Sequence, residues 1–138
     1  MSFADVGYHF IVGQSGKVYE GRPYSSLGAH TFKLNEKNLG VAFLGCYDPK
    51  GCAKEKYRLC KVTDAMIDSA ARVIAYVAHT EGFNIDKNTV MPRAVCEVKR
   101  TGQLRFPYSP GELITEKLDL LIEKARNYRS LLARQALR

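Results

Sequence analysis

Hydrophobic and polar residues are spaced differently in the two halves of this chain, which predicts strands first and helices later. Residues 8–12 (Tyr-His-Phe-Ile-Val) are aromatic and β-branched, which favours a strand. A Gln-Ser-Gly turn at 14–16 and the alternating Lys-Val-Tyr-Glu at 17–20 predict that this strand returns as a hairpin. Residues 39–44 are almost continuously apolar, which predicts a buried central strand.

The spacing becomes helical after residue 62. Apolar residues recur every three or four positions between Thr63, a favoured N-cap, and Gly82, a usual helix stop. A short apolar segment at 90–95 predicts one further strand, and 101–108 has the composition of a loop.

The last helix carries its own start signal. Ser109 is a favoured N-cap, Pro110 suits the first helical position and Glu112 completes a capping box. From there one apolar face continues through Tyr128 and on to Leu132.

Strands followed by two amphipathic helices predict an α/β fold, with a mixed central β-sheet flanked by α-helices and an extended basic C-terminal helix. A chain of 138 residues with 46% hydrophobic content is large enough for one core. We expect a single domain over 1–128 and a basic helical extension over 129–138.

The net charge of the chain indicates which kinds of partner it favours. A net charge of +7 favours nucleic acid, acidic lipid or acidic wall polymers, although a basic surface with no partner has the same composition. The stretch 124–138 is basic and has no acid, so it is the part expected to dock on an acidic surface. No apolar run approaches the ~20 residues that span a bilayer, and the first ten residues lack a signal-peptide pattern.

Four cysteines leave the redox state open between two disulfides and buried thiols. A single bridge, if formed, is expected between Cys52 and Cys60 across a basic loop. No CxxC pair occurs, and the histidines are too scattered for a Cys/His zinc cluster. Of these, His9 is interpreted as a structural strand residue and His79 as solvated or packed on a helix.

Four motifs follow one another in the first third: D-x-G-Y-x-F from Asp5, G-x-V-Y-E-G-R from Gly16, G-A-H at 28–30 and N-x-G-V-x-F-x-G from Asn38. In this order and spacing they resemble the type-2 N-acetylmuramoyl-L-alanine amidases, a family that includes peptidoglycan recognition proteins and phage T7-type lysozymes. The resemblance implies a domain that cuts or binds the peptide stem of bacterial cell wall.

The resemblance also implies where a catalytic zinc would be held, and this chain departs from that pattern. The family's first ligand, a histidine, lies upstream of the first motif, beyond the start of this chain. Pro92 stands where the family has its second histidine, and Ser109 stands where it has cysteine. Tyr8 matches a catalytic tyrosine, but an aromatic residue at a strand start also suits a core. We therefore expect no metal, no other cofactor and no amidase activity.

Two functions of different classes remain, with a residual or metal-independent enzyme as a weaker third. In the first, a non-catalytic domain binds a peptidoglycan fragment through the remnant groove of Tyr8, Arg22, Tyr24, His30 and Arg93. That groove lacks the Gly-Trp that usually follows Gly-Arg in the family.

In the second, the fold is a structural subunit of a protein or nucleic-acid assembly. It would dock through an exposed sheet edge and through the last helix, at Arg126, Arg129, Leu132 and Arg134. A signal peptide upstream would favour extracellular recognition, and a native start at Met1 an intracellular subunit.

Overall fold

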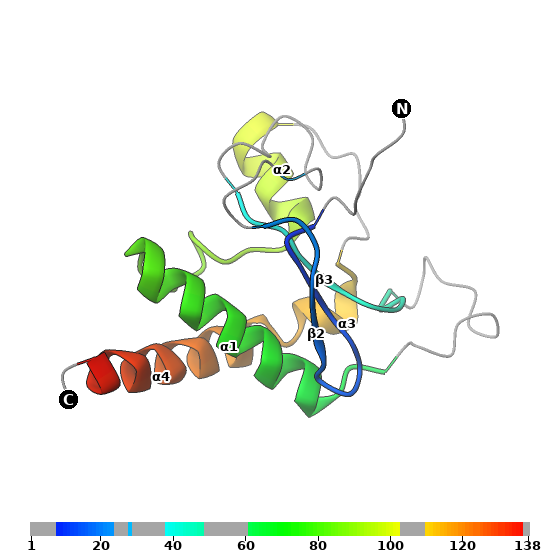
Figure 1. Cartoon of the computed structure of the whole chain (residues 1–138). Coiled ribbons are helices and arrows are strands. Elements are labelled where there is room, and N and C mark those ends of the chain that lie inside the picture. Colours follow the sequence, from blue (N-terminus) through cyan, green and yellow to red (C-terminus); the bar gives the residue numbers. More distant parts are fainter. Residues whose placement is uncertain (1–7, 24–27, 29–37, 49–60, 103–109, 137–138) are drawn as a thin grey trace.

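A computed structural model of the chain describes residues 8–23, 28, 38–48, 61–102 and 110–136 (Figure 1). Within these ranges three strands precede four helices, in the α/β arrangement that the sequence predicts. The elements are β1 Phe10–Val12, β2 Val18–Glu20, β3 Val41–Phe43, α1 Asp64–Glu81, α2 Arg93–Thr101, α3 Glu112–Thr115 and α4 Leu118–Ala136.

The sheet has the order β2-β1-β3, with β2 antiparallel and β3 parallel to β1. The predicted hairpin is confirmed: the Gly13 N–H donates to the Lys17 carbonyl over 2.9 Å, and Gly16 turns the chain with a φ of 88°. The predicted strand at 39–44 exists as β3, but its central position is wrong. In the described sheet β1 is central, because β3 pairs with β1 alone.

Helix α1 begins and ends where the sequence predicts. Thr63 Oγ1 accepts from the Met66 N–H at 3.2 Å and donates to the Gln14 carbonyl at 2.5 Å. Gly82 adopts a φ of 79°, and its N–H returns to the Ala78 carbonyl at 2.8 Å. The N-cap hydroxyl therefore both starts the helix and fastens it to the β1–β2 turn.

The core forms where α1 meets β1 on one side and α4 on another (Figure 1). Small residues of α1 let α4 approach closely, since Ala70, Ala71 and Ala78 are fully buried. Val41 and Phe43 pack their side chains against this core from β3. The main members of the cluster are Val12, Met66, Ile67, Ile85, Ile114, Leu121, Ile122 and Ala125.

The predicted strand at 90–95 is wrong, because Pro92 begins helix α2 there. Pro92 has a ψ of 147°, and its carbonyl accepts the Cys96 N–H at 3.0 Å. A strand requires a neighbour to satisfy its peptide groups, whereas a helix satisfies its own. Val95 and Val98 thereby share one helical face and stay 42% and 49% exposed.

The predicted start of the last helix is also wrong. Gly111, not Ser109, occupies the N-cap, so the expected capping box does not form; Ser109 itself lies outside the described residues. Helix α3 ends at Thr115, and α4 begins separately at Leu118. The helix start at Gly111 packs closely on Tyr47, since a Cβ on Gly111 would lie 2.6 Å from the Tyr47 carbonyl carbon.

Cys46 is disulfide-bonded, and Cys96 is a buried thiol. The expected Cys52–Cys60 bridge is therefore wrong, since the chain's four cysteines leave Cys46 only one of those two as a partner. Positions 52 and 60 themselves lie outside the described residues.

Candidate functional site

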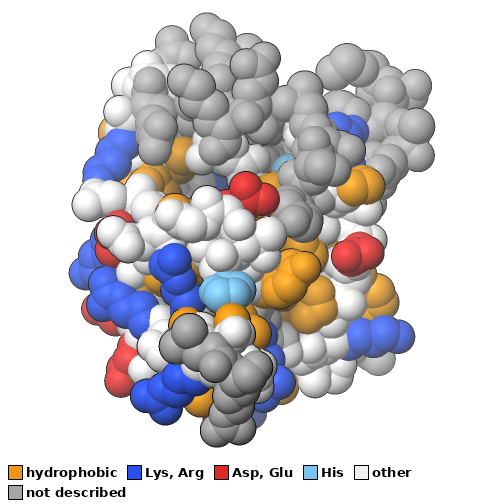
Figure 2. Space-filling view, turned by 60° about the vertical axis from the view of Figure 1, so that its left-hand side comes forward, with side chains coloured by type: hydrophobic (Ala, Val, Ile, Leu, Met, Phe, Trp, Pro, Cys, Tyr) orange, Lys and Arg blue, Asp and Glu red, His pale blue; other side chains and the backbone are white. Residues whose placement is uncertain are grey.

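Lys and Arg side chains are spread over the face shown in Figure 2, with hydrophobic and acidic side chains between them. No helix of the described ranges is long and apolar enough to cross a membrane.

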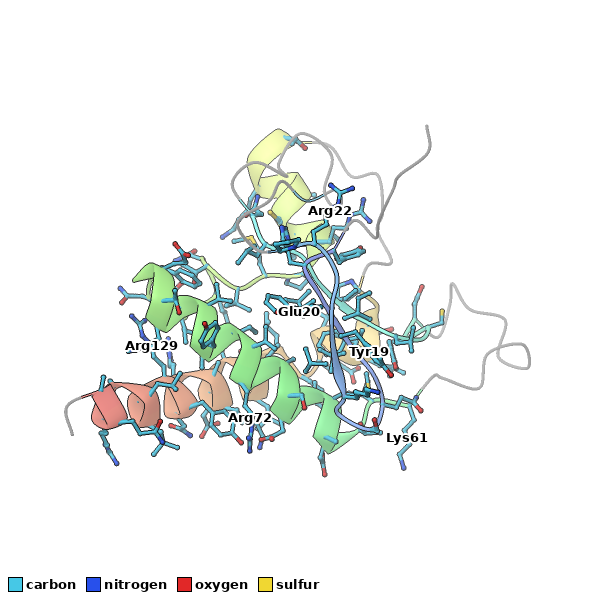
Figure 3. All side chains as sticks on the ribbon, viewed as in Figure 1. Tyr19, Glu20, Arg22, Lys61, Arg72 and Arg129 are labelled. Carbon is cyan, nitrogen blue, oxygen red and sulfur yellow. The ribbon has the colours of Figure 1, made fainter. Side chains whose placement is uncertain are left out.

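Two predicted groove residues lie opposite each other at one end of the β1–β2 hairpin. The Arg22 N–H donates to the Tyr8 carbonyl over 3.0 Å, next to a bond of 2.9 Å from the Gly21 N–H to the His9 carbonyl. Tyr8 and Arg22 are both half-buried. Figure 3 shows Arg22 at the end of the sheet away from the β1–β2 turn. The hairpin therefore places the backbones of Tyr8 and Arg22 next to each other.

His9 anchors this end of the sheet from inside. Its ring is 1% exposed, and its Nδ1 accepts the Gly40 N–H at 3.0 Å. The Gly40 carbonyl in turn accepts from the backbone N–H groups of His9 and Phe10. The structural interpretation of His9 is confirmed, because this ring holds the start of β3 against β1.

Pro92 and Arg93 lie at the first turn of α2. Pro92 is buried and Arg93 is half-buried. Figure 1 shows α2 toward the end of the sheet away from the β1–β2 turn. A pyrrolidine ring has no lone pair to offer a metal, so position 92 contributes packing and a helix start only.

The remaining predicted positions, Tyr24, His30 and Ser109, lie outside the described residues, and their roles stay predictions. Among the described residues, no group of three His, Cys, Asp or Glu side chains is placed to hold a metal ion.

Two of the four predicted docking residues on α4 bind their own chain. Arg126 Nε donates to the Ile85 carbonyl at 2.7 Å, and Arg129 donates to the Phe83 carbonyl. Figure 3 shows Arg129 near the end of α1. Both arginines thus satisfy carbonyls of the segment that follows α1, whereas Arg134 is exposed and Leu132 half-buried.

The apolar stripe of α4, expected to need a partner, is covered largely by α1. Leu121 and Ala125 are buried in the core, and Tyr128 packs against it. Helix α4 also runs without a break through the predicted domain boundary at residue 128. That boundary stays a prediction.

A polar cluster that the sequence did not single out joins α1 to α4. The Asp68 carboxylate accepts the Tyr128 hydroxyl, meets Arg72 Nε at 3.2 Å and lies 3.7 Å from Lys124 Nζ. The Tyr128 hydroxyl, more than Arg72 or Lys124, lowers the pKa of Asp68, while partial burial acts in the opposite direction. The spacing of Asp68 and Arg72 was its only sequence signal, since Tyr128 lies 60 residues further on.

Comparison with known proteins identifies the family to which this chain belongs. The sequence profile described as N-acetylmuramoyl-L-alanine amidase matches residues 2–103. Peptidoglycan-recognition protein SD of Drosophila melanogaster is 45% identical over 83 residues, which are 60% of this chain and 41% of that protein. Human peptidoglycan recognition protein 3 is 49% identical over 49 residues, which are 36% of this chain and 14% of that protein. The chain thus spans less than half of each relative.

Two solved structures share the fold. N-acetylmuramoyl-L-alanine amidase LysC from Clostridium intestinale URNW superposes with a TM-score of 0.60 at 20% identity, over 85% of this chain and 64% of that one. The X-ray structure of Apis mellifera PGRP-SA superposes with a TM-score of 0.56 at 21% identity, over 85% and 59%. At these identities the likeness concerns the fold alone.

Proposed function

Because the chain belongs to the N-acetylmuramoyl-L-alanine amidase family, we propose that it is a non-catalytic domain that binds a bacterial cell-wall muropeptide. The binding site is the sheet end of Tyr8, Arg22 and Arg93, together with Tyr24 and His30. The names of the relatives, peptidoglycan recognition proteins, support the ligand class.

The observation that carries the proposal is the backbone bond between Arg22 and Tyr8, 3.0 Å long. It fixes the two residues relative to each other before any ligand arrives, so less side-chain and backbone freedom is lost on binding. A muropeptide offers carboxylates and a sugar ring. A guanidinium pairs with a carboxylate through two parallel hydrogen bonds, and a phenol packs on the apolar face of a sugar.

The non-catalytic part of the proposal rests on the donor set. A catalytic zinc requires three protein ligands and an open position for water. Pro92 supplies no ligand atom, and the neutral hydroxyl of Ser109 is a poor substitute for a thiolate. Amide hydrolysis by the family's zinc chemistry therefore has no support at these positions.

Calorimetric titration with a muramyl tripeptide tests the site. We expect Arg22→Ala and Arg93→Ala each to weaken binding by about tenfold or more, as loss of a charge-assisted hydrogen bond does. Arg134→Ala is the matched control, because it removes the same charge from an exposed position on α4. Equal affinity in all three variants would refute the groove.

A structural subunit remains the second candidate, and one observation favours it. Leu131 is 49% exposed near the end of α4, beside Arg134 and the half-buried Leu132. Arg126 and Arg129 would contribute less than the sequence predicts, since both already bind backbone carbonyls. Deletion of residues 127–138 tests this role: incorporation of the shortened chain into an assembly at an unchanged level would refute it.

A further inference from the structure

Helix α2 continues directly from a segment that we call the connector, residues 83–92. The connector contains no helix or strand and ends at Pro92, the N-cap of α2, so Arg93 is the first residue after it. Lys99 of α2 also reaches back to the connector, with its Nζ 3.4 Å from Asn88 Oδ1. The close pairings between described elements join α1 with α4 and β1 with α1, β2 and β3, and α2 is in none of them. Within the described part of the chain, the connector therefore sets where Arg93 lies.

The connector is braced by its own hydrogen bonds around Asp86. The Asp86 carboxylate accepts the Asn88 N–H at 2.8 Å, and the Asp86 carbonyl accepts the Val90 N–H at 2.8 Å. Thr89 Oγ1 accepts the Asp86 N–H at 3.0 Å and donates to the Asn84 carbonyl at 2.6 Å. A turn braced in this way moves as one piece, so a shift at its start is passed on to its end.

Helix α4 holds the start of the connector. Arg126 Nε donates to the Ile85 carbonyl at 2.7 Å, and Arg129 donates to the Phe83 carbonyl. Both donors are charged guanidinium groups, and such hydrogen bonds are stronger than those between neutral groups. Ile85 is itself only 3% exposed, so the connector is fastened to the core and to α4 at the same place.

We propose that Arg126 and Arg129 are positioning residues of the muropeptide site, because they hold the connector and thereby fix Arg93. The inference rests on the proposed function, since the position of Arg93 matters for binding only if Arg93 contacts the ligand. Figure 3 shows Arg129 well apart from Arg22, so Arg129 acts from a distance and not by touching a ligand there. A loosened connector lets α2 move, and binding must then order it again.

Calorimetric titration of a muramyl tripeptide tests the proposal on a double variant, Arg126→Ala with Arg129→Ala. We expect this double variant to bind the tripeptide about three- to tenfold more weakly than the unmodified chain. Thr63→Ala is the control, because it also removes a bond that fastens α1 to its surroundings, but at the β1–β2 turn, the other end of the sheet. It should lower stability and leave the affinity unchanged.

Two further backgrounds show whether the arginines act through Arg93. The double variant should still weaken binding when Arg22→Ala is present, and should have no further effect when Arg93→Ala is present. Equal weakening in both backgrounds would overturn the inference, because the arginines would then act on the whole fold. Equal binding by the double variant and an unmodified chain that binds would overturn this inference alone. An unmodified chain that binds no tripeptide would refute the proposed function and the inference together.

Hydrogen exchange without ligand measures the connector directly. The double variant is expected to lose protection at the amides of Val90 and Cys96, which both bond to carbonyls of the connector. The amide of Gly13, which bonds within the β1–β2 hairpin, should keep its protection. Unchanged protection at Val90 and Cys96 would overturn the inference, since the arginines would then not hold the connector.

Discussion

Of the glycines at 13, 16, 82, 102 and 111, Gly111 has the least room for an added methyl group. Its φ of 111° and ψ of 151° lie in a region open essentially to glycine alone. A Cβ there would meet the Tyr47 carbonyl carbon at 2.6 Å, its oxygen at 2.7 Å and the Asp48 nitrogen at 2.9 Å. All three are backbone atoms, which cannot swing aside as a long side chain does.

The expected loss for Gly111→Ala has two parts. Backbone strain contributes about 1–3 kcal/mol, and loss of the 3.1 Å bond from the Leu113 N–H to the Tyr47 carbonyl adds about 0.5–1.5 kcal/mol. We therefore predict a destabilisation of roughly 2–4 kcal/mol. Urea unfolding followed by circular dichroism measures it.

Gly82→Ala is the matched control. Gly82 also has a positive φ, 79°, but a Cβ there meets nothing within 4 Å. Only the left-handed conformation is penalised, at about 1 kcal/mol. If Gly111→Ala proves no more destabilising than Gly82→Ala, the close approach to Tyr47 does not constrain this helix start.

Three further predictions concern the contacts that hold α1 and α4. Thr63→Ala should lower the free energy of unfolding by about 1–2 kcal/mol, since the hydroxyl both caps α1 and binds the β1–β2 turn; thermal unfolding measures this, and no change would contradict it. Tyr128→Phe should raise the pKa of Asp68 toward its ordinary value. Because the folded state lowers this pKa, the hydrogen bond stabilises the fold at pH values above the ordinary pKa of Asp68. That stabilisation is lost as the pH falls through the lowered pKa. The deficit of Tyr128→Phe should therefore shrink in acid, and a deficit independent of pH would argue against the bond. Arg126→Ala should destabilise by about 1 kcal/mol through the bond to residue 85, whereas Arg134→Ala should be neutral within about 0.5 kcal/mol; equal effects in urea unfolding would contradict the intramolecular role.

Local signals predicted the elements whose stabilising contacts are close in sequence. Gln14 to Gly16 form the turn that their composition indicates, and α1 is bounded by Thr63 and Gly82 because each satisfies helix-end peptide groups by itself. The family resemblance, carried by four motifs in the first third, likewise agrees with the profile match.

What the sequence did not predict depends on distant neighbours. The apolar run of β3 indicates burial, but whether it is central or at an edge depends on which strands exist beside it. Residues 90–95 have strand-like composition, yet Pro92 and the absence of a neighbour in the described sheet favour the helix. The start of α3 at Gly111 involves packing on Tyr47, 64 positions earlier by residue number.

The candidate site was predictable only in part. The hairpin places Tyr8 beside Arg22, as two adjacent strands of known register must. The docking role expected for Arg126 and Arg129 overlooked the carbonyls that follow α1, because nothing local in the sequence brings residues 83–85 to α4.

Recognition without zinc is tested most directly by titrating a muramyl tripeptide into the chain in excess chelator. The proposal predicts a saturable binding heat of the same affinity with chelator as with added zinc, and intact tripeptide afterwards. Binding that appears only with zinc, hydrolysis of the ligand, or no binding under either condition would contradict it.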